Sequence, residues 1–297
     1  HGYMRNGMAA DNSYGNSGIA RFGEGGAKGS INFDAGRGHA FKIGVGYEWR
    51  PPMANTAFIA PEICNDYVSN LKDEHVFSSE FSYQFQNSWL HANLNAYYSR
   101  LDHVTEWQCF YNDDENSFTY VSMTGLKKEY YGVEAGLDFK LTSWLNFKTI
   151  GSICEAKNLN NVTAVYMLSK SADVYSDKAY VAGMRESGTP LTVGSLGLNF
   201  HKSGWFIDLN ANYYDRIYLS YSPSYRYERV LKNRQSAHIT YPEIFDAVVS
   251  EDGNSFLPEA TEQTKGHGGW MVDMSIGKSV RLKKGSLNFN LMITNLL

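Results

Sequence analysis

The stretch HAFKIGVGYEW, residues 39–49, alternates between apolar and polar side chains. Successive side chains of a β-strand point to opposite faces, so this segment would have one apolar face backed by glycines and charges. The apolar set is Phe41, Ile43, Val45, Tyr47 and Trp49. A soluble sandwich would bury that face, whereas a membrane barrel would turn it to lipid and the polar face to an aqueous lumen.

The same alternation recurs along the chain in ten segments, which form five pairs joined by short turns rich in Gly, Ser, Asn or Lys. Each segment is about 9–11 residues long, the length of a tilted strand that crosses a bilayer. The predicted strands are 26–35, 39–49, 76–85, 89–99, 130–141, 145–153, 192–200, 205–214, 270–280 and 286–295.

The connections between the pairs are long and polar, and run over roughly 50–75, 106–128, 155–190 and 219–268. A soluble β domain usually has short loops at both ends, and long structureless connections count against one. Short turns at one end and long loops at the other are typical of bacterial outer-membrane barrels.

Aromatic residues collect at both ends of the predicted apolar faces, as the interfacial girdles of membrane barrels do. The girdle candidates are Phe85, Phe200 and Trp205 near the short turns, and Tyr47, Trp49, Tyr98, Tyr131, Tyr213 and Trp270 near the long connections. Charges on the opposite face would be costly in a packed core but not in a wet lumen. A sandwich or propeller explains the alternation but neither the one-sided loops nor the aromatic rows, so the fold predicted is an antiparallel transmembrane β-barrel.

Composition limits the remaining function classes. The net charge of the 297 residues is −4, and no clustered basic surface predicts nucleic-acid binding. No apolar run approaches the ~18 residues of a transmembrane helix, and the polar opening HGYMRNGMAADNSYGNSG is expected to continue an upstream segment rather than to be a signal peptide. Cys64, Cys109 and Cys154 are too few and too scattered for a disulfide scaffold or a zinc site, although one bridge stays open.

The predicted topology places both ends of the sheet on the side of the long connections. Bacterial outer-membrane barrels generally keep their termini on the short-turn side, and unpaired strand edges cannot face lipid. The ten strands are therefore expected to be an arc of a larger barrel, with strands before residue 1 and at least one after Leu297.

Three segments resemble barrel strands of TonB-dependent outer-membrane receptors. They are NLKDEHVFSSEFSYQF (70–85), MTGLKKEYYGVEAGLDFKLTSWLNF (123–147) and GGWMVDMSIGKSVRLKKGSLNFNLMITNLL (268–297), the last of which looks like the penultimate strands. The resemblance is nearest to the Bacteroidetes type, which carries a carboxypeptidase-regulatory-like domain at its N-terminus.

This resemblance implies a 22-stranded barrel closed by an N-terminal plug, which imports a scarce solute with energy from TonB–ExbB–ExbD. Residues 1–297 would be the C-terminal barrel portion, the twelfth to twenty-first strands, with the plug, the TonB box and the last strand absent. The implied partners are outer-membrane lipid, a small-molecule, glycan or peptide ligand, and an outer-membrane lipoprotein lid. No cofactor is implied. A passive pore and a barrel enzyme such as a lipase remain the alternatives.

No catalytic or metal-ligating residue is predicted. None of the histidines pairs with a serine on the lipid face, as a barrel lipase would require. The acidic stretch NDDENS, residues 112–117, lacks the spacing and the glycine of an EF-hand loop and is expected to be a solvated loop tip.

Two aromatic segments in the long connections are the candidate ligand site. EWQCFY (106–111) and SYSPSYRYERV (220–230) combine exposed aromatic rings with arginine, which are favoured binding anchors. The alternative is that these rings pack the loops against each other. The candidate ligand-binding residues are Trp107, Tyr111, Tyr225, Arg226 and Tyr227.

Overall fold

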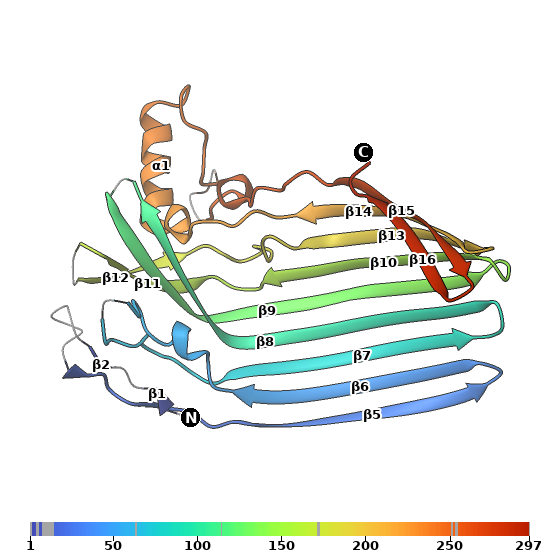
Figure 1. Cartoon of the computed structure of the whole chain (residues 1–297). Helices are drawn as coiled ribbons and strands as arrows, with labels where there is room; N and C mark the ends of the chain where they lie inside the picture. The colour runs from blue at the N-terminus through green and yellow to red at the C-terminus, as the bar shows by residue number, and fades with distance from the viewer. Residues whose placement is uncertain are drawn as a thin grey trace.

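The structure is a computed structural model. It describes residues 15–296 except 63, 114, 171–172, 251 and 253–254, together with 2–3 and 6–7. Most of the polar opening stretch, and Leu297, therefore lie outside the described residues. The chain forms one long antiparallel sheet, with a smaller group of strands and a helix at one end (Figure 1).

All ten predicted strands are present, and they lie side by side in sequence order. Each strand pairs with the strand that precedes it and the strand that follows it, without a crossover. Two further strands, which follow the sixth strand in the sequence, lie outside this order. The strands are β5 (Gly25–Gly36), β6 (His39–Arg50), β7 (Glu74–Gln86), β8 (Leu90–Asn112), β9 (Ser117–Lys140), β10 (Leu145–Asn158), β13 (Pro190–Lys202), β14 (Trp205–Ile217), β15 (Gly269–Leu282) and β16 (Gly285–Ile293).

The register keeps the predicted apolar positions on one face of the sheet. Ile43 pairs with Ile31 on one side and with Phe81 on the other, and Phe81 pairs in turn with Ala96. A slip of one residue would move an entire strand's apolar set to the opposite face. These side chains have no covering layer: Ile31 is 76% exposed and Phe33 is 62% exposed.

The other face carries polar side chains that find partners across the strands. Lys42 forms an ion pair with Glu80, and Lys148 Nζ lies 3.5 Å from Asp138 Oδ2. Ser82 Oγ donates to Asn95 Oδ1 at 2.8 Å. This face is therefore a polar surface whose side chains pair with one another.

The aromatic rows fall where the sequence predicts them. Tyr98 pairs with Tyr131, and Tyr213 pairs with Trp270, with ring centroids 5.0 Å apart, at the end that leads into the long connections. At the short-turn end Trp144 packs edge-on against Phe200 at 5.4 Å. The apolar band is thus bounded on both sides by aromatic rings.

Two of the short turns require glycine. Gly38 and Gly204 have φ angles of 85° and 77°, in the left-handed region that favours glycine. A Cβ added at Gly38 would lie 1.9 Å from Gln86 O, and one at Gly204 would lie 2.4 Å from Ser279 O. The next hairpin therefore packs directly against each turn.

The prediction of a loop over 106–128 is wrong. β8 and β9 continue past the aromatic row as one long hairpin and stay paired as far as Asn112↔Ser117. β11 (Val162–Leu168) pairs with β9 and with β12 (Val174–Ala179), so much of 155–190 is also sheet. The physical reason is that apolar side chains in these polar stretches bury one another.

The remaining elements are short. They comprise α1 (Glu228–Thr240), the 3-10 turns η2 (Ala54–Thr56), η3 (Pro223–Arg226) and η4 (Pro258–Thr261), and the two-residue strands β1 (Gly2–Tyr3), β2 (Asn6–Gly7), β3 (Gly15–Asn16) and β4 (Ala20–Arg21). Among the described residues, no helix has the length and apolar character needed to cross a membrane.

Candidate functional site

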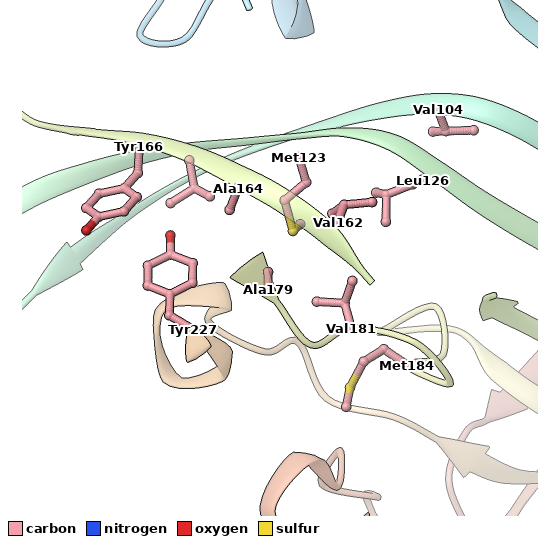
Figure 2. Close-up of a cluster of buried hydrophobic side chains, with 11 residues drawn as sticks. Val104, Met123, Leu126, Val162, Ala164, Tyr166, Ala179, Val181, Met184 and Tyr227 are labelled. Atoms are coloured by element: carbon pink, nitrogen blue, oxygen red, sulfur yellow. The ribbon is translucent and has the colours of Figure 1, made fainter. Parts of the chain in front are cut away.

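The long connections build a folded lobe at one end of the sheet. We define the lobe as the outer ends of β8 and β9 (residues 104–126) with β11, β12, η3 and α1. Its core is apolar, and Figure 2 shows Met123, Ala164, Val181 and Tyr227 converging from different elements. The lobe is held together as a globular domain is, by side chains withdrawn from water.

A cavity of about 780 Å³ opens between the outer end of β8 and the chain around η3. It brings together the two aromatic segments that the sequence singles out, although Trp107 and Ser220 are 113 positions apart in the sequence. One wall is formed by residues 107–113 and Glu115, and the other by Ser220, Tyr221, Ser222, Ser224, Tyr225, Arg229 and Val230.

Three of the five candidate residues line this cavity. The Trp107 indole Nε1 donates to Ile59 O at 2.9 Å, which fixes the ring against the 50–75 connection. The Tyr111 hydroxyl donates to Asn116 Oδ1. Tyr225 is 66% exposed and stands in the opposite wall.

Arg226 and Tyr227 lie behind the cavity wall. The Arg226 guanidinium lies 4.8 Å from the Tyr221 ring centre and donates to Glu262 O at 3.0 Å, and burial lowers its pKa. Tyr227 is 1% exposed and stacks on Tyr166 with centroids 5.1 Å apart. Burial raises the pKa of the Tyr227 hydroxyl. The structure gives these two residues a packing role, as in the alternative considered from the sequence.

A second cavity of about 290 Å³ adjoins the first and shares Trp107, Gln108 and Tyr221 with it. Lys128 is buried in its wall, where its ammonium forms an ion pair with Glu106 and lies 2.6 Å from Glu186 Oε1. These groups lie beyond the aromatic row of Tyr131. Burial alone would lower the pKa of Lys128, but the two carboxylates outweigh burial and raise it.

The candidate residues chosen from the sequence did not include this charged group or the polar side chains Gln108, Asn112 and Asp113. Strand parity could have found Lys128, because it falls on the same face as Glu134 and Asp138. The polar residues of 108–113 gave no such signal. Their position along a strand edge sets them apart, and the sequence predicted a loop there instead of a strand.

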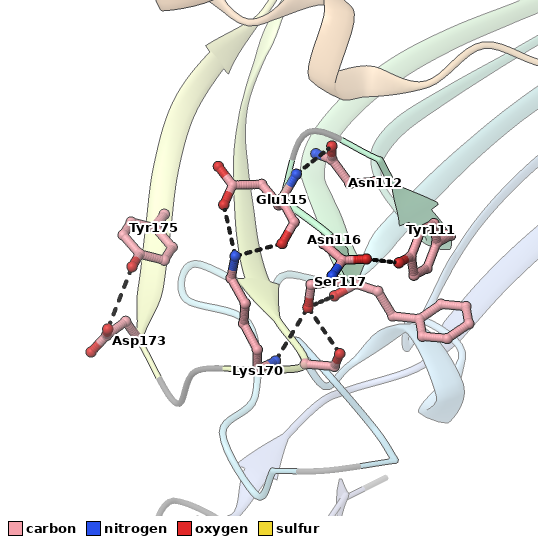
Figure 3. Close-up of polar contacts among 10 residues, drawn as sticks. Tyr111, Asn112, Glu115, Asn116, Ser117, Lys170, Asp173 and Tyr175 are labelled. Carbon is pink, nitrogen blue, oxygen red and sulfur yellow. Dashed lines mark hydrogen bonds and ion pairs between the residues drawn. The ribbon is translucent and has the colours of Figure 1, made fainter.

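The tip of the β8–β9 hairpin is tied to the end of β11 by polar contacts (Figure 3). Lys170 Nζ lies 3.1 Å from Glu115 Oε2, and its backbone N–H donates to Ser117 Oγ at 3.2 Å. Ser117 Oγ also lies 3.0 Å from Ser169 Oγ. These contacts hold the outer rim of the larger cavity in place.

The three cysteines are free thiols: Cys64 is buried and Cys109, in the wall of the larger cavity, is exposed. The disulfide that the sequence left open is therefore not formed. Among the described residues, no group of three or more His, Cys, Asp and Glu side chains is placed to hold a metal ion.

The sheet has an apolar face without a covering layer, a polar face with internal pairs, and a lobe at one end only. These features define an arc of an antiparallel β-barrel. Residues 11–296 match the family described as TonB dependent receptor-like, beta-barrel. The chain belongs to that family.

The solved structure of the copper transporter OprC shows the same fold. The copper transporter OprC superposes with a TM-score of 0.60 at 13% identity, over 97% of this chain and 36% of the OprC chain. The chain thus spans about a third of the length of OprC. The Pseudomonas putida toluene transporter TodX is more distant, with a TM-score of 0.39 at 12% identity over 92% of this chain and 68% of TodX. No curated protein matches the sequence.

Proposed function

We propose that this chain is the C-terminal barrel portion of an outer-membrane receptor, of the Bacteroidetes type, that binds a scarce extracellular solute and imports it with TonB-coupled energy. The observation that carries the proposal is the family match over residues 11–296. The cavity at the end of the long connections supports it, because a receptor of this kind captures its solute at the outer surface.

An open sheet supports the view that these strands belong to a larger barrel. β5 and β16 each have a neighbour on one side only among the described residues. Unpaired backbone groups facing hydrocarbon cost several kcal/mol each, so further strands must cover these edges in a membrane. We propose that they belong to a 22-stranded barrel, with the plug supplied by the rest of the receptor.

In this proposal the chain supplies barrel wall and binding surface. The solute, a small molecule, glycan or peptide, would enter the larger cavity between Trp107, Tyr111 and Tyr225. Movement inward would depend on the plug and on TonB–ExbB–ExbD, which act through the rest of the receptor. An outer-membrane lipoprotein covering the lobe fits the same arrangement, and no bond-making chemistry is assigned to this chain.

The test uses the full-length protein purified from outer membranes. We expect it to bind the immobilised periplasmic domain of TonB from the same bacterium. In planar lipid bilayers we expect no steady ion conductance, because a plug closes the lumen. Steady conductance steps without TonB binding would contradict the proposal and identify a passive pore.

A further inference from the structure

The outer end of β8 has an unpaired edge. β7 pairs with β8 only as far as His75↔Asp102, whereas β9 accompanies β8 on the other side to Asn112. Among the described residues, no strand or bridge pairs with β8 on the β7 side between Glu106 and Tyr111. Alternate residues of this stretch therefore present backbone N–H and C=O groups to whatever lies beside them.

The larger cavity lies along this edge. Seven consecutive residues, 107–113, line it. Neighbouring side chains of a strand point to opposite faces, so a cavity on one face would be lined by every second residue. Lining by consecutive residues means that the cavity meets the strand at its edge.

The cavity is also the gap in a nearly closed sheet. The lobe strands run in the order β8, β9, β11 and β12, and β12 is bridged to the chain after η3 through Ala179↔Tyr227. The sheet thus curls around the apolar core until Tyr221 and Tyr225 face the edge of β8 across the cavity. Figure 1 shows the paired ends of β8 and β9 rising beside α1.

The edge has a repeat that fits one class of ligand. Backbone groups that point the same way recur every two residues, about 7 Å apart in an antiparallel strand. An extended polypeptide carries donors and acceptors at the same interval, and peptides commonly bind by adding a strand to an exposed edge. A glycan has hydroxyl groups but no such regular alternation of donor and acceptor.

The charges indicate what one end of the peptide would carry. The carboxylate of Asp113 stands at the outer end of the edge and forms no ion pair among the described residues. Glu115 is paired with Lys170, and Arg229 with Asp177, so their charges are already compensated. A basic side chain or a free amino terminus would be favoured beside Asp113.

We infer that the larger cavity binds an extended oligopeptide, about five residues of which pair as an added strand with residues 107–111 of β8. The inference rests on the proposed function and names its solute class. Tyr221 and Tyr225 would contact the peptide from the opposite wall, and its outer end would carry the positive charge.

The probe is a tryptic digest of casein, applied to the full-length receptor in detergent micelles. Retained peptides are sequenced, and the tightest is resynthesised in two versions that are N-methylated at odd or at even positions. One version should lose affinity at least tenfold, since two or three backbone hydrogen bonds disappear. The other should bind within about twofold, since its methyl groups point away from β8.

Site variants complete the test. Tyr225→Ala should weaken the peptide several-fold, whereas Tyr241→Ala, at an exposed ring outside the cavity, should leave binding unchanged. Retention of no peptide, equal loss for both N-methylated versions, or binding insensitive to Tyr225→Ala would overturn the inference. TonB binding without peptide binding would leave the proposed function standing, and peptide pairing without TonB binding would remove that function alone.

Discussion

The ten-strand sheet and the lobe use apolar side chains in opposite ways. In the sheet, Ile31 and Phe33 point outward with nothing over them, while the polar face is paired within itself. In the lobe, Met123 and Tyr227 are withdrawn into a core, and buried charges such as Lys128 and Arg226 have partners within the protein. Along β8 and β9, the apolar side chains change from facing outward in the sheet to being buried in the lobe.

This contrast identifies the surroundings of each region. A sheet that leaves a continuous band of large apolar side chains uncovered is stable only against another apolar phase. A lobe that buries its apolar side chains in a core is stable in aqueous solvent. The change occurs just beyond the row that contains Tyr98 and Tyr131, where β8 carries its register shifts. In the proposed membrane placement, the aromatic row is the border between the lipid-facing and water-facing regions.

Truncation in the lobe core should have the largest effect and should be confined to the lobe. Replacing Tyr227 by Ala removes a ring stacked on Tyr166 and should destabilise the lobe by about 3–5 kcal/mol. Replacing Tyr227 by Phe should change stability by less than about 1 kcal/mol, because the buried hydroxyl has no hydrogen-bond partner among the described residues. Amide hydrogen exchange would report this as faster exchange in β11 and β12 for the Ala variant alone. Equal acceleration in β5 to β7 would show that the two regions are one cooperative unit.

A charge on the outward face of the sheet should have the next largest effect. Leu94→Arg places a guanidinium in the middle of the apolar band and should cost about 2–4 kcal/mol. Asn93→Arg, the neighbour on the polar face opposite Gly136, has room for the longer side chain and should cost little. The amount of heat-modifiable folded receptor in outer membranes compares the two variants. If both accumulate equally, the assignment of the faces is wrong.

Removing one hydrogen bond where the lobe meets the 50–75 connection should have a smaller, local effect. Trp107→Phe leaves the buried carbonyl of Ile59 without its donor and should cost about 1–3 kcal/mol. Hydrogen exchange should accelerate within 57–68, where backbone bonds such as Val68 N to Ala57 O close the loop. Trp89→Phe, at the exposed short-turn end, is the control and should leave this segment unchanged. If amide exchange within 57–68 is unchanged in Trp107→Phe, the Trp107 indole does not anchor this connection.

The Glu186–Lys128 pair predicts a weak acid sensitivity of the lobe. Burial alone would raise the pKa of Glu186, but the Lys128 ammonium and the Tyr130 hydroxyl outweigh it and lower the pKa. The pair therefore stabilises the lobe fully at a pH above the pKa of Glu186 in the unfolded chain, which is about 4.3. This stabilisation is lost as the pH falls through the lower pKa of Glu186 in the folded protein. Because Glu186 is 38% exposed, the loss should not exceed about 1 kcal/mol. Amide exchange in β9, corrected for the intrinsic rate at each pH, should accelerate at low pH in the wild-type protein. The same acceleration should be absent from Glu186→Gln.

The sheet was predictable because its signal is local. Alternation such as Phe41–Ile43–Val45 sets the strand and its faces, glycine-containing turns set the hairpins, and the order of neighbours follows from them. The lobe was predicted only as polar connections. Its strands are stabilised by a shared core in which residues distant in sequence, such as Met123 and Val181, are buried together, and such packing leaves no periodic pattern.

The candidate site shows the same division. Composition alone led to Trp107, Tyr111 and Tyr225, which line the larger cavity and whose contact with a ligand stays a prediction. It could not separate them from Arg226 and Tyr227, since the difference depends on which side of η3 faces the core. The unpaired edge of β8 was beyond prediction, because a strand must first be known before its edge can be found.

The most direct test of the central claim asks which end of the sheet faces outward. A membrane-impermeant maleimide should label Cys109 on intact cells that express the full-length receptor, and Cys109→Ser should abolish that signal. In a variant with Cys109 and Cys154 changed to Ser, a thiol introduced by Ser203→Cys at a short turn should react only after the outer membrane is permeabilised. Labelling of the short turn in intact cells, with Cys109 protected until permeabilisation, would contradict an outward-facing binding lobe.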